Sequence, residues 1–167
     1  MKKIKNILWS DFFFKEKKKS LSDALKKVDL FSDLNKRQLR DISKITFIRK
    51  YKKGEAIFKK DDPSYGLFIV LKGEVDIFIQ NKNKKLILGN YENSEYFGEF
   101  ALAKENTRKA SAFSKEDSTL CYIFREDLNK LFIQNPRLGI SVYQKVIELL
   151  IEKLEYADEC LIKWKGQ

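Results

Sequence analysis

Histidine is absent from this sequence of 167 residues. Its absence excludes a histidine general base, histidine ligands to zinc and a proximal histidine for haem. Cysteine is rare as well, because Cys121 and Cys160 are the two present and neither belongs to a CxxC pattern. A disulfide framework and a structural zinc site are therefore not expected. No nucleophile–base pair or cluster of metal-ligand residue types stands out, so the sequence predicts neither an enzyme nor a metal site.

Long apolar runs are missing too. No stretch of about 18 uncharged apolar residues occurs, so no membrane-spanning helix is expected. The apolar patch at residues 7–14 is interrupted by Ser10 and Asp11 and lacks a small-residue cleavage site, which makes it a poor signal peptide. Together these absences predict a soluble, cytoplasmic protein.

The chain does contain a sizeable apolar fraction and an excess of positive charge. Apolar residues make up 43% of the sequence and aromatic residues 13%, which is enough for one well-filled core. With 34 Lys and Arg against 24 Asp and Glu, the formal net charge is +10. This charge favours anionic partners but does not choose among nucleotides, nucleic acids, acidic proteins and anionic lipids.

The start of the chain combines lysines with large apolar side chains. The pattern over residues 1–20 predicts a basic amphipathic helix, and we assign residues 1–27 to an N-terminal helical extension. Such a helix can pack its aromatic side chains on its own domain, which we favour, or it can lie on an anionic membrane surface. The residues concerned are Lys2, Lys3, Lys5, Lys15, Lys17, Lys18 and Lys19, with Ile4, Ile7, Leu8, Trp9, Phe12, Phe13 and Phe14.

Capping residues predict two further helices in the opening third of the chain. One is expected to begin at Ser22-Asp23 and to run through Val28. A second is expected to begin at Ser32-Asp33 or at Asn35. Its buried stripe would consist of Leu39, Ile42 and Ile45.

From residue 47 onward, short apolar runs alternate with turn residues, which is typical of β-strands. The turns use the positive φ of glycine, the fixed φ of proline and the left-handed tolerance of asparagine. Since little helix separates the runs, the sequence predicts a mainly β fold with helices (α+β). This fold would be an antiparallel jelly roll or barrel, flanked by N-terminal helices and a long C-terminal helix. The predicted strands are residues 56–58, 66–71, 75–80, 85–88 and 119–124.

Helical periodicity returns at Asp127, breaks at Asn135-Pro136 and continues to about Trp164. In this last helix the apolar residues alternate steps of three and four, the spacing of a coiled-coil seam. The seam predicts a homodimer through the C-terminal helix, and packing of the stripe on the barrel alone is the alternative. The seam residues are Ile140, Tyr143, Ile147, Leu150, Leu154, Ala157, Leu161 and Trp164, with Val146, Leu149 and Ile151 widening the apolar face.

Residues 96–102, followed by residues 108–110, carry the candidate chemistry. Gly98 precedes a short helical turn and has no Cβ, so backbone N–H groups there can approach an anion closely. Arg108 can neutralise a phosphate through charge-assisted hydrogen bonds of about 1.5–3 kcal/mol each. Glu99 would repel a phosphate but can accept a hydrogen bond from a sugar hydroxyl, and phosphate with ribose indicates a nucleotide. An exposed ion pair between Glu99 and Arg108 is the alternative.

Three sequence blocks also carry a family resemblance. They are Leu71-Lys72-Gly73-Glu74-Val75, Phe97-Gly98-Glu99-Phe100-Ala101-Leu102 and Arg108-Lys109-Ala110. In their order, and in the spacing from glycine to arginine, they resemble the cyclic nucleotide-binding domain family, which includes catabolite activator protein and the regulatory subunits of protein kinase A. The resemblance covers about Val28 to Leu161. It implies a cyclic nucleotide-binding barrel at residues 28–135 and a lid and dimerisation helix at residues 136–167.

The resemblance implies a role for each residue of the phosphate-binding cassette. Glu99 would bind the ribose 2′-hydroxyl and Arg108 the exocyclic phosphate oxygens, while backbone N–H groups complete the cradle. The C-terminal helix would close over the base near residues 156–159. The implied ligand-binding residues are Gly98, Glu99, Phe100, Ala101, Arg108, Lys109 and Ala110, with Leu88 and Ala112 lining the base.

The cassette departs from the family pattern at three places. Asn106-Thr107 replaces a proline that often precedes the arginine, and Ser94-Glu95 replaces a glycine–acid pair before the cassette. Both changes affect loop shape more than ligand chemistry. Lys109 stands where relatives often carry Ala, Ser or Thr, so the base preference stays open. We expect cyclic AMP rather than cyclic GMP.

The function implied is that of a stand-alone sensor that binds a cyclic nucleotide as its ligand, without a further cofactor. It would act through movement of the C-terminal helix and through contacts with a dimer partner or an unidentified effector protein. Relatives that regulate transcription append a helix-turn-helix domain after the long helix, so we do not expect operator-specific DNA binding. The alternative is a ligand-free interaction or membrane-docking protein that retains the barrel.

Overall fold

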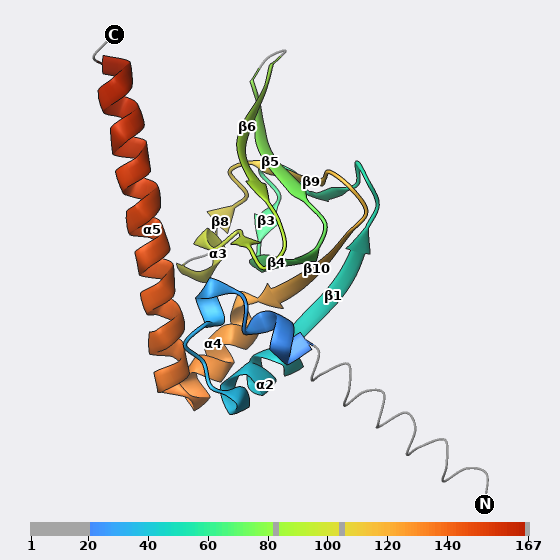
Figure 1. The fold of residues 1–167 in the computed structure, drawn as a ribbon, viewed down its shortest axis with the longest axis vertical. Helices are drawn as coiled ribbons and strands as arrows, with labels where there is room; N and C mark the ends of the chain where they lie inside the picture. The colour runs from blue at the N-terminus through green and yellow to red at the C-terminus, as the bar shows by residue number, and fades with distance from the viewer. Residues whose placement is uncertain (1–20, 82–83, 104–105, 166–167) are drawn as a thin grey trace, which may run out of the picture.

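Two antiparallel sheets pack against each other in the computed structural model, which describes residues 21–81, 84–103 and 106–165 (Figure 1). One sheet has the order β1 (Thr46–Tyr51), β10 (Ser118–Phe124), β4 (Gly66–Lys72) and β7 (Tyr96–Phe97). The other has the order β2 (Ala56–Phe58), β9 (Ser111–Ser114), β5 (Val75–Asn81) and β6 (Lys84–Tyr91). A short ladder joins β3 (Pro63–Ser64) to β8 (Asn106–Thr107). The predicted antiparallel, jelly-roll-like fold is confirmed.

The central strands β4 and β10 are buried on both faces, which explains their continuous apolar sequences. In β4, Phe68 and Val70 point into the core between the sheets, whereas Leu67 and Ile69 point to a second core beneath the helices. Because side chains alternate between the two faces of a strand, β4 contributes to both cores. The runs at residues 66–71 and 119–124, predicted as strands from the sequence, are confirmed.

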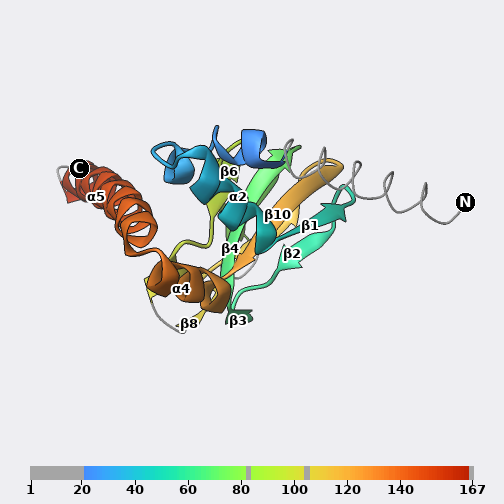
Figure 2. The ribbon, with the colours of Figure 1, turned by 90° about the horizontal axis from the view of Figure 1, so that it is seen from below.

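A helical layer covers the outer face of the first sheet (Figure 2). It contains a helical turn at residues 21–25, the 3-10 helix η1 (Asp29–Phe31), α2 (Lys36–Lys44) and α4 (Arg125–Gln134). The long helix α5 (Pro136–Lys165) joins this layer with its first turns, where Leu138, Val142 and Val146 are buried. The helix-side core is therefore built from the two ends of the described chain together with β4 and β10.

Helix α2 begins where one of the two predicted caps lies. The Asn35 side chain accepts hydrogen bonds from the backbone N–H groups of Arg37 and Gln38, at 2.9 and 3.0 Å. The Gln38 side chain in turn accepts from the Asn35 N–H at 2.9 Å, which completes a capping box. Asn35 is therefore the cap, and the alternative start at residues 32–33 is wrong.

The first predicted helix differs from the structure at both ends. Ser22 already lies inside a helical turn, so its predicted role as the N-cap is wrong. Its hydroxyl is buried instead and lies 3.4 Å from the hydroxyl of Ser43 in α2. The helix ends at residue 25 rather than at Val28, because Val28 begins the tighter turn that leads into η1. The predicted N-terminal helix at residues 1–20 lies outside the described residues.

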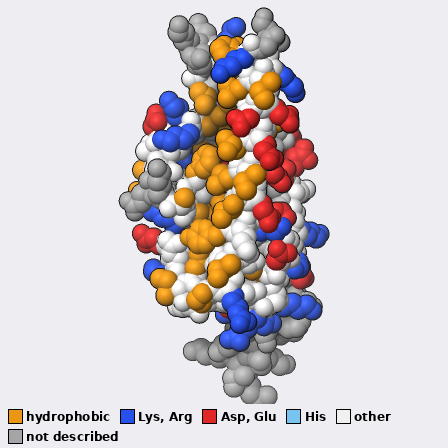
Figure 3. Space-filling model, turned by 90° about the vertical axis from the view of Figure 1, so that its left-hand side faces the viewer, with side chains coloured by type: hydrophobic (Ala, Val, Ile, Leu, Met, Phe, Trp, Pro, Cys, Tyr) orange, Lys and Arg blue, Asp and Glu red, His pale blue; other side chains and the backbone are white. Residues whose placement is uncertain are grey.

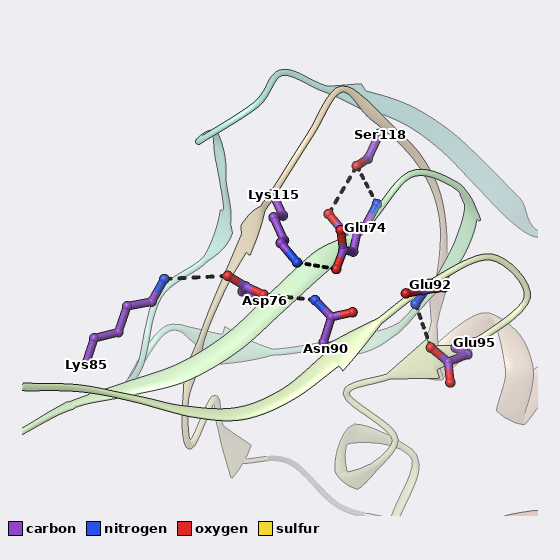
Figure 4. Close-up of polar contacts among 8 residues, drawn as sticks. All are labelled: Glu74, Asp76, Lys85, Asn90, Glu92, Glu95, Lys115 and Ser118. Carbon is purple, nitrogen blue, oxygen red and sulfur yellow. Dashed lines mark hydrogen bonds and ion pairs between the residues drawn. The ribbon is translucent and has the colours of Figure 1, made fainter.

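The sheet containing β5 and β6 is braced by polar contacts that reach toward the loop before β7 (Figure 4). The Asn90 side chain donates to Asp76 at 3.0 Å, which ties β6 to β5. In the following turn, the Glu95 carboxylate accepts from the Glu92 N–H at 2.6 Å, and Ser94 adopts a positive φ of 73°. These contacts stabilise the turn that precedes β7 and the segment after it. The other contacts drawn are those of Lys85 with Asp76, Lys115 with Glu74, and Ser118 with Glu74.

Helix α5 begins at Pro136, directly after the predicted break, and Asn135 accepts a hydrogen bond from the Leu138 N–H at 3.3 Å. Every side chain from residue 155 to residue 165 is exposed. The C-terminal half of the helix extends past the helical layer alongside the barrel (Figure 1). In the part of the chain that the structure describes, no helix has the length and apolar content needed to cross a bilayer.

Candidate ligand-binding site

Gly98 is the residue on which the candidate site is built, between β7 and the short helix α3 (Phe100–Ala103). Its φ of +81° lies in the left-handed region that glycine adopts without a steric penalty. A Cβ placed on residue 98 would lie 2.4 Å from Nη1 of Arg108 and 3.4 Å from the carbonyl oxygen of Gly66. Glycine is therefore required both by the backbone and by the guanidinium beside it.

The backbone of Arg108 is held by the turn between β2 and β3. Its N–H donates to the Asp62 carbonyl at 2.8 Å, and its carbonyl accepts from the Asp61 N–H at 2.8 Å. The Asp62 carboxylate accepts from the Lys59 N–H at 2.7 Å and so stabilises the same turn. Residue 61 adopts a φ of 72°, which aspartate tolerates better than most residues. The β3–β8 ladder then continues the pairing on the other side of Arg108.

The Arg108 side chain lies inside the barrel, with 6% of the residue exposed. Its Nη2 donates to the Gly66 carbonyl at 2.8 Å, and its guanidinium carbon lies 4.3 Å from the ring centre of Phe58 and 5.5 Å from that of Phe68. Its Nε is buried and lacks a hydrogen-bond partner among the described residues. Burial lowers the Arg108 pKa, and Tyr122 together with the charges of Glu99 and Asp62 offsets this only in part.

Glu99 is also buried, with 3% of the residue exposed, and its charge is among those that act on Arg108. Its Oε1 lies 2.7 Å from Nζ of Lys153 on α5, so the carboxylate is paired with a lysine rather than with the arginine. Burial tends to lower the Lys153 pKa, but Glu99 and Tyr91 outweigh it and the pKa is raised. The predicted alternative, an exposed ion pair between Glu99 and Arg108, is therefore wrong.

The other residues predicted for the site fall into two groups. Ala101, Ala110 and Ala112 are buried, and the Ala101 N–H donates to the Gly98 carbonyl at 3.1 Å within the turn. By contrast, Phe100, Lys109 and Leu88 are exposed, and Leu88 lies on β6 in the other sheet. The structure thus brings Gly98, Glu99 and Arg108 together. Ligand contacts stay a prediction for all nine residues.

Sequence reasoning missed Lys153 as a neighbour of this site. It placed residues 156–159 of the long helix there, whereas Tyr156 is 71% exposed and the contact with Glu99 comes from Lys153, three residues earlier. No local signal marks Lys153, because it lies 54 positions from Glu99 in the sequence. The Phe58 ring and the Gly66 carbonyl were missed for the same reason, since each meets Arg108 only through the fold.

The arrangement has a specific chemical consequence. Buried charges are usually paired with an opposite charge, because an isolated charge in a low-dielectric interior is costly. Among the described residues, the buried guanidinium of Arg108 meets the Gly66 carbonyl, two aromatic faces and the Tyr122 side chain, but no carboxylate in an ion pair. An anion that reached this position would supply the missing charge. Glu99 beside it offers an acceptor for a hydroxyl group.

The chain is similar in sequence to a known domain family and to several known proteins. The family model for the cyclic nucleotide-binding domain matches residues 48–135, which include the whole cassette. The cyclic AMP receptor protein of Thermus thermophilus is 33% identical over 117 residues, covering 66% of this chain and 50% of that protein. The cGMP-dependent protein kinase of Plasmodium berghei is 30% identical over 128 residues, covering 77% of this chain and 14% of the kinase.

Solved structures give the same result for the fold. A cyclic nucleotide-binding domain from Methylobacillus flagellatus superposes with a TM-score of 0.74 at 21% identity, covering 89% of this chain and 84% of that one. The chain spans half or less of the length of the curated relatives it matches. The matching model covers more than half of the 167 residues and includes Gly98, Glu99 and Arg108. The chain therefore belongs to the cyclic nucleotide-binding domain family.

Proposed function

We propose that this chain binds cyclic AMP as a sensor module, with Arg108 on the phosphate and Glu99 on the ribose 2′-hydroxyl. The observation that carries the proposal is the buried guanidinium of Arg108, which has an unpartnered Nε and is not neutralised by a carboxylate of the described residues. A cyclic phosphate carries the single negative charge that this position lacks. It also accepts the charge-assisted hydrogen bonds that arginine donates.

Glu99 distinguishes the proposed ligand from a simple phosphate. A buried carboxylate close to the anion site would repel a second negative charge, but it accepts a hydrogen bond from a neutral hydroxyl. A ribose ring fused to a cyclic phosphate presents both groups in one rigid ligand, so little conformational entropy is lost on binding. Gly98, which precedes Glu99 in the chain, keeps the space beside Arg108 free of a Cβ.

The base is the least constrained part of the ligand. One relative is named for cyclic AMP and another for cyclic GMP, so the names do not decide between them. Lys109 follows the arginine, at the position where a threonine can favour guanine in the family, so this residue leaves the base preference open. We propose cyclic AMP, and titration with both nucleotides decides between the two bases. Lys109 is exposed and so adds positive charge near the cassette without filling it.

The output of binding is proposed to pass through α5 to a second copy of the chain or to an effector protein. A band of apolar side chains runs along this helix on the molecular surface, with acidic side chains gathered along one edge (Figure 3). Most of the apolar seam predicted for α5 is solvent-exposed, so most of its side chains do not pack on the barrel. Its exposed large members are Ile140, Tyr143, Ile147, Leu154, Leu161 and Trp164.

Isothermal titration calorimetry of the full chain tests the proposal. We expect binding of cyclic AMP, weaker binding of cyclic GMP, and little binding of linear 5′-AMP, whose additional charge faces Glu99. The matched variant is Arg108→Met, which removes the guanidinium and keeps an unbranched side chain against Phe58. If wild-type protein binds none of these ligands below the millimolar range, the sensor proposal is wrong, and the ligand-free interaction protein becomes the better interpretation.

A further inference from the structure

We propose that Lys153 competes with the ligand for Glu99, so that recognition of the ribose hydroxyl releases the C-terminal helix from the barrel. The inference rests on the proposed function of the site and concerns its regulation. Its starting point is the 2.7 Å contact between Nζ of Lys153 and Oε1 of Glu99. Lys153 therefore occupies the carboxylate that, in the proposed function, accepts a hydrogen bond from the ribose 2′-hydroxyl.

Burial makes the competition direct. The Glu99 side chain is 4% exposed, whereas the Lys153 side chain paired with it is 39% exposed. A carboxylate that water barely reaches has little room for a second donor, so the ribose hydroxyl and the Lys153 ammonium compete for it. Lys153 also lies 5.9 Å from the ring centre of Phe100, the first residue of α3. Lys153 therefore also lies beside the first residue of the candidate cradle.

Lys153 lies just past the point on α5 where the buried apolar side chains end, so its contact holds the exposed part of the helix. Val146 is the last buried residue of the helix, and Leu149 and Leu150 are partly buried beyond it. The apolar side chains of α5 that follow Leu150 are exposed. The Lys153 ammonium contacts Glu99 and the Tyr91 hydroxyl on the barrel. Breaking this contact would leave the exposed distal half of α5 without the polar tie that holds it against the barrel.

The lower part of the helix is anchored independently. Nζ of Lys145 lies 3.5 Å from the Asp29 carboxylate and 4.0 Å from that of Asp33, which ties α5 to the segment around η1. Within α5 the same ammonium lies 3.2 Å from Glu148. Loss of the Lys153 contact would therefore not detach the whole helix. It would free the segment past residue 150, which carries much of the exposed apolar band.

The test combines one substitution with two ligands. Lys153→Met removes the charge and keeps an unbranched chain, and Lys163→Met on the exposed end of the same helix is the matched control. Titration of both variants and the wild type uses cyclic AMP and 2′-deoxy cyclic AMP. We expect Lys153→Met to bind cyclic AMP about tenfold more tightly than wild type, because a competing charge-assisted hydrogen bond is gone. The deoxy ligand lacks the hydroxyl group that would bind Glu99, so Lys153→Met should bind it with the same affinity as wild type. Lys163→Met should match wild type with both ligands.

Other results overturn the inference in distinguishable ways. Equal tightening with both ligands would mean that Lys153 covers the site without competing for the carboxylate. Weaker binding of cyclic AMP by Lys153→Met would mean that the lysine contacts the ligand instead. If wild type and both variants bind neither ligand, the proposed function itself fails. Hydrogen exchange of residues 151–165 supplies the second measurement: Lys153→Met without ligand should exchange faster there, as should wild type with cyclic AMP, and equal protection in all states would contradict the release.

Discussion

Nη1 of Arg108 occupies the space where residue 98 would carry a Cβ, at 2.4 Å from the ideal position of that atom. Gly98 and Arg108 are ten positions apart in the sequence, and residue 98 cannot gain a side chain without displacing the guanidinium. The relationship explains why the glycine and the arginine of the cassette belong together, because the small residue creates the volume that the large one fills.

The first prediction concerns Gly98→Ala. The left-handed φ costs a residue with a Cβ about 1–2 kcal/mol, and the clash adds displacement of the guanidinium. Gly54→Ala is the control, because Gly54 has a φ of +80° but nothing within 4 Å of the added Cβ. Thermal unfolding should show a larger loss for Gly98→Ala than for Gly54→Ala. Affinity for cyclic AMP should fall at least about tenfold in the first and stay unchanged in the second, and equal losses of affinity would contradict the role given to Gly98.

The second prediction separates ligand binding from stability at Arg108. Arg108→Met should weaken cyclic AMP binding by about 2–5 kcal/mol, the usual cost of removing one partner of a buried charge pair. The free energy of unfolding without ligand should be equal to or higher than that of wild type, because a buried charge that pairs with no carboxylate of the described residues is replaced by an apolar side chain. Chemical denaturation in urea measures this. A loss of stability above about 2 kcal/mol would show that Arg108 has a structural role.

The third prediction concerns the exposed seam of α5. Ile147→Glu with Leu154→Glu should shift the chain from dimer to monomer in sedimentation velocity experiments, because charges at seam positions disrupt a coiled coil. Ile162→Glu is the control, since Ile162 is 71% exposed but lies outside the predicted seam. A wild-type chain that sediments as a monomer at high micromolar concentration would contradict the proposed dimer.

The fourth prediction concerns the two cysteines. Burial raises the pKa of the Cys121 thiol to about 12, whereas Cys160 is exposed on α5. The thiolate is the reactive form, so a maleimide at pH 7 to 8 should label one thiol per folded chain and two after unfolding. Mass spectrometry of the tryptic peptides identifies the site, which should be Cys160. Rapid labelling of Cys121 in the folded chain would contradict the packing of β10 in the helix-side core.

Much of the fold could be predicted from the sequence because its signals are local. The Asn35 cap and the break at Asn135-Pro136 depend on residues within one helical turn. Short pairings were harder to predict: β7, β3 and β8 are two residues each, too short for an alternating pattern, and the four-residue β9 was missed as well. They form because neighbouring strands supply their hydrogen-bond partners.

The sequence by itself determined the antiparallel strands, the long C-terminal helix and the glycine-to-arginine spacing, since all three follow from residue type and short-range periodicity. Only the tertiary structure decided what each site residue meets. Arg108 lies over Phe58 and Glu99 meets Lys153, contacts that span 50 and 54 positions and depend on how the sheets and α5 pack. Long-range packing leaves no periodic trace in the chain, so the pairing of the carboxylate with the helix could be found only in the folded protein.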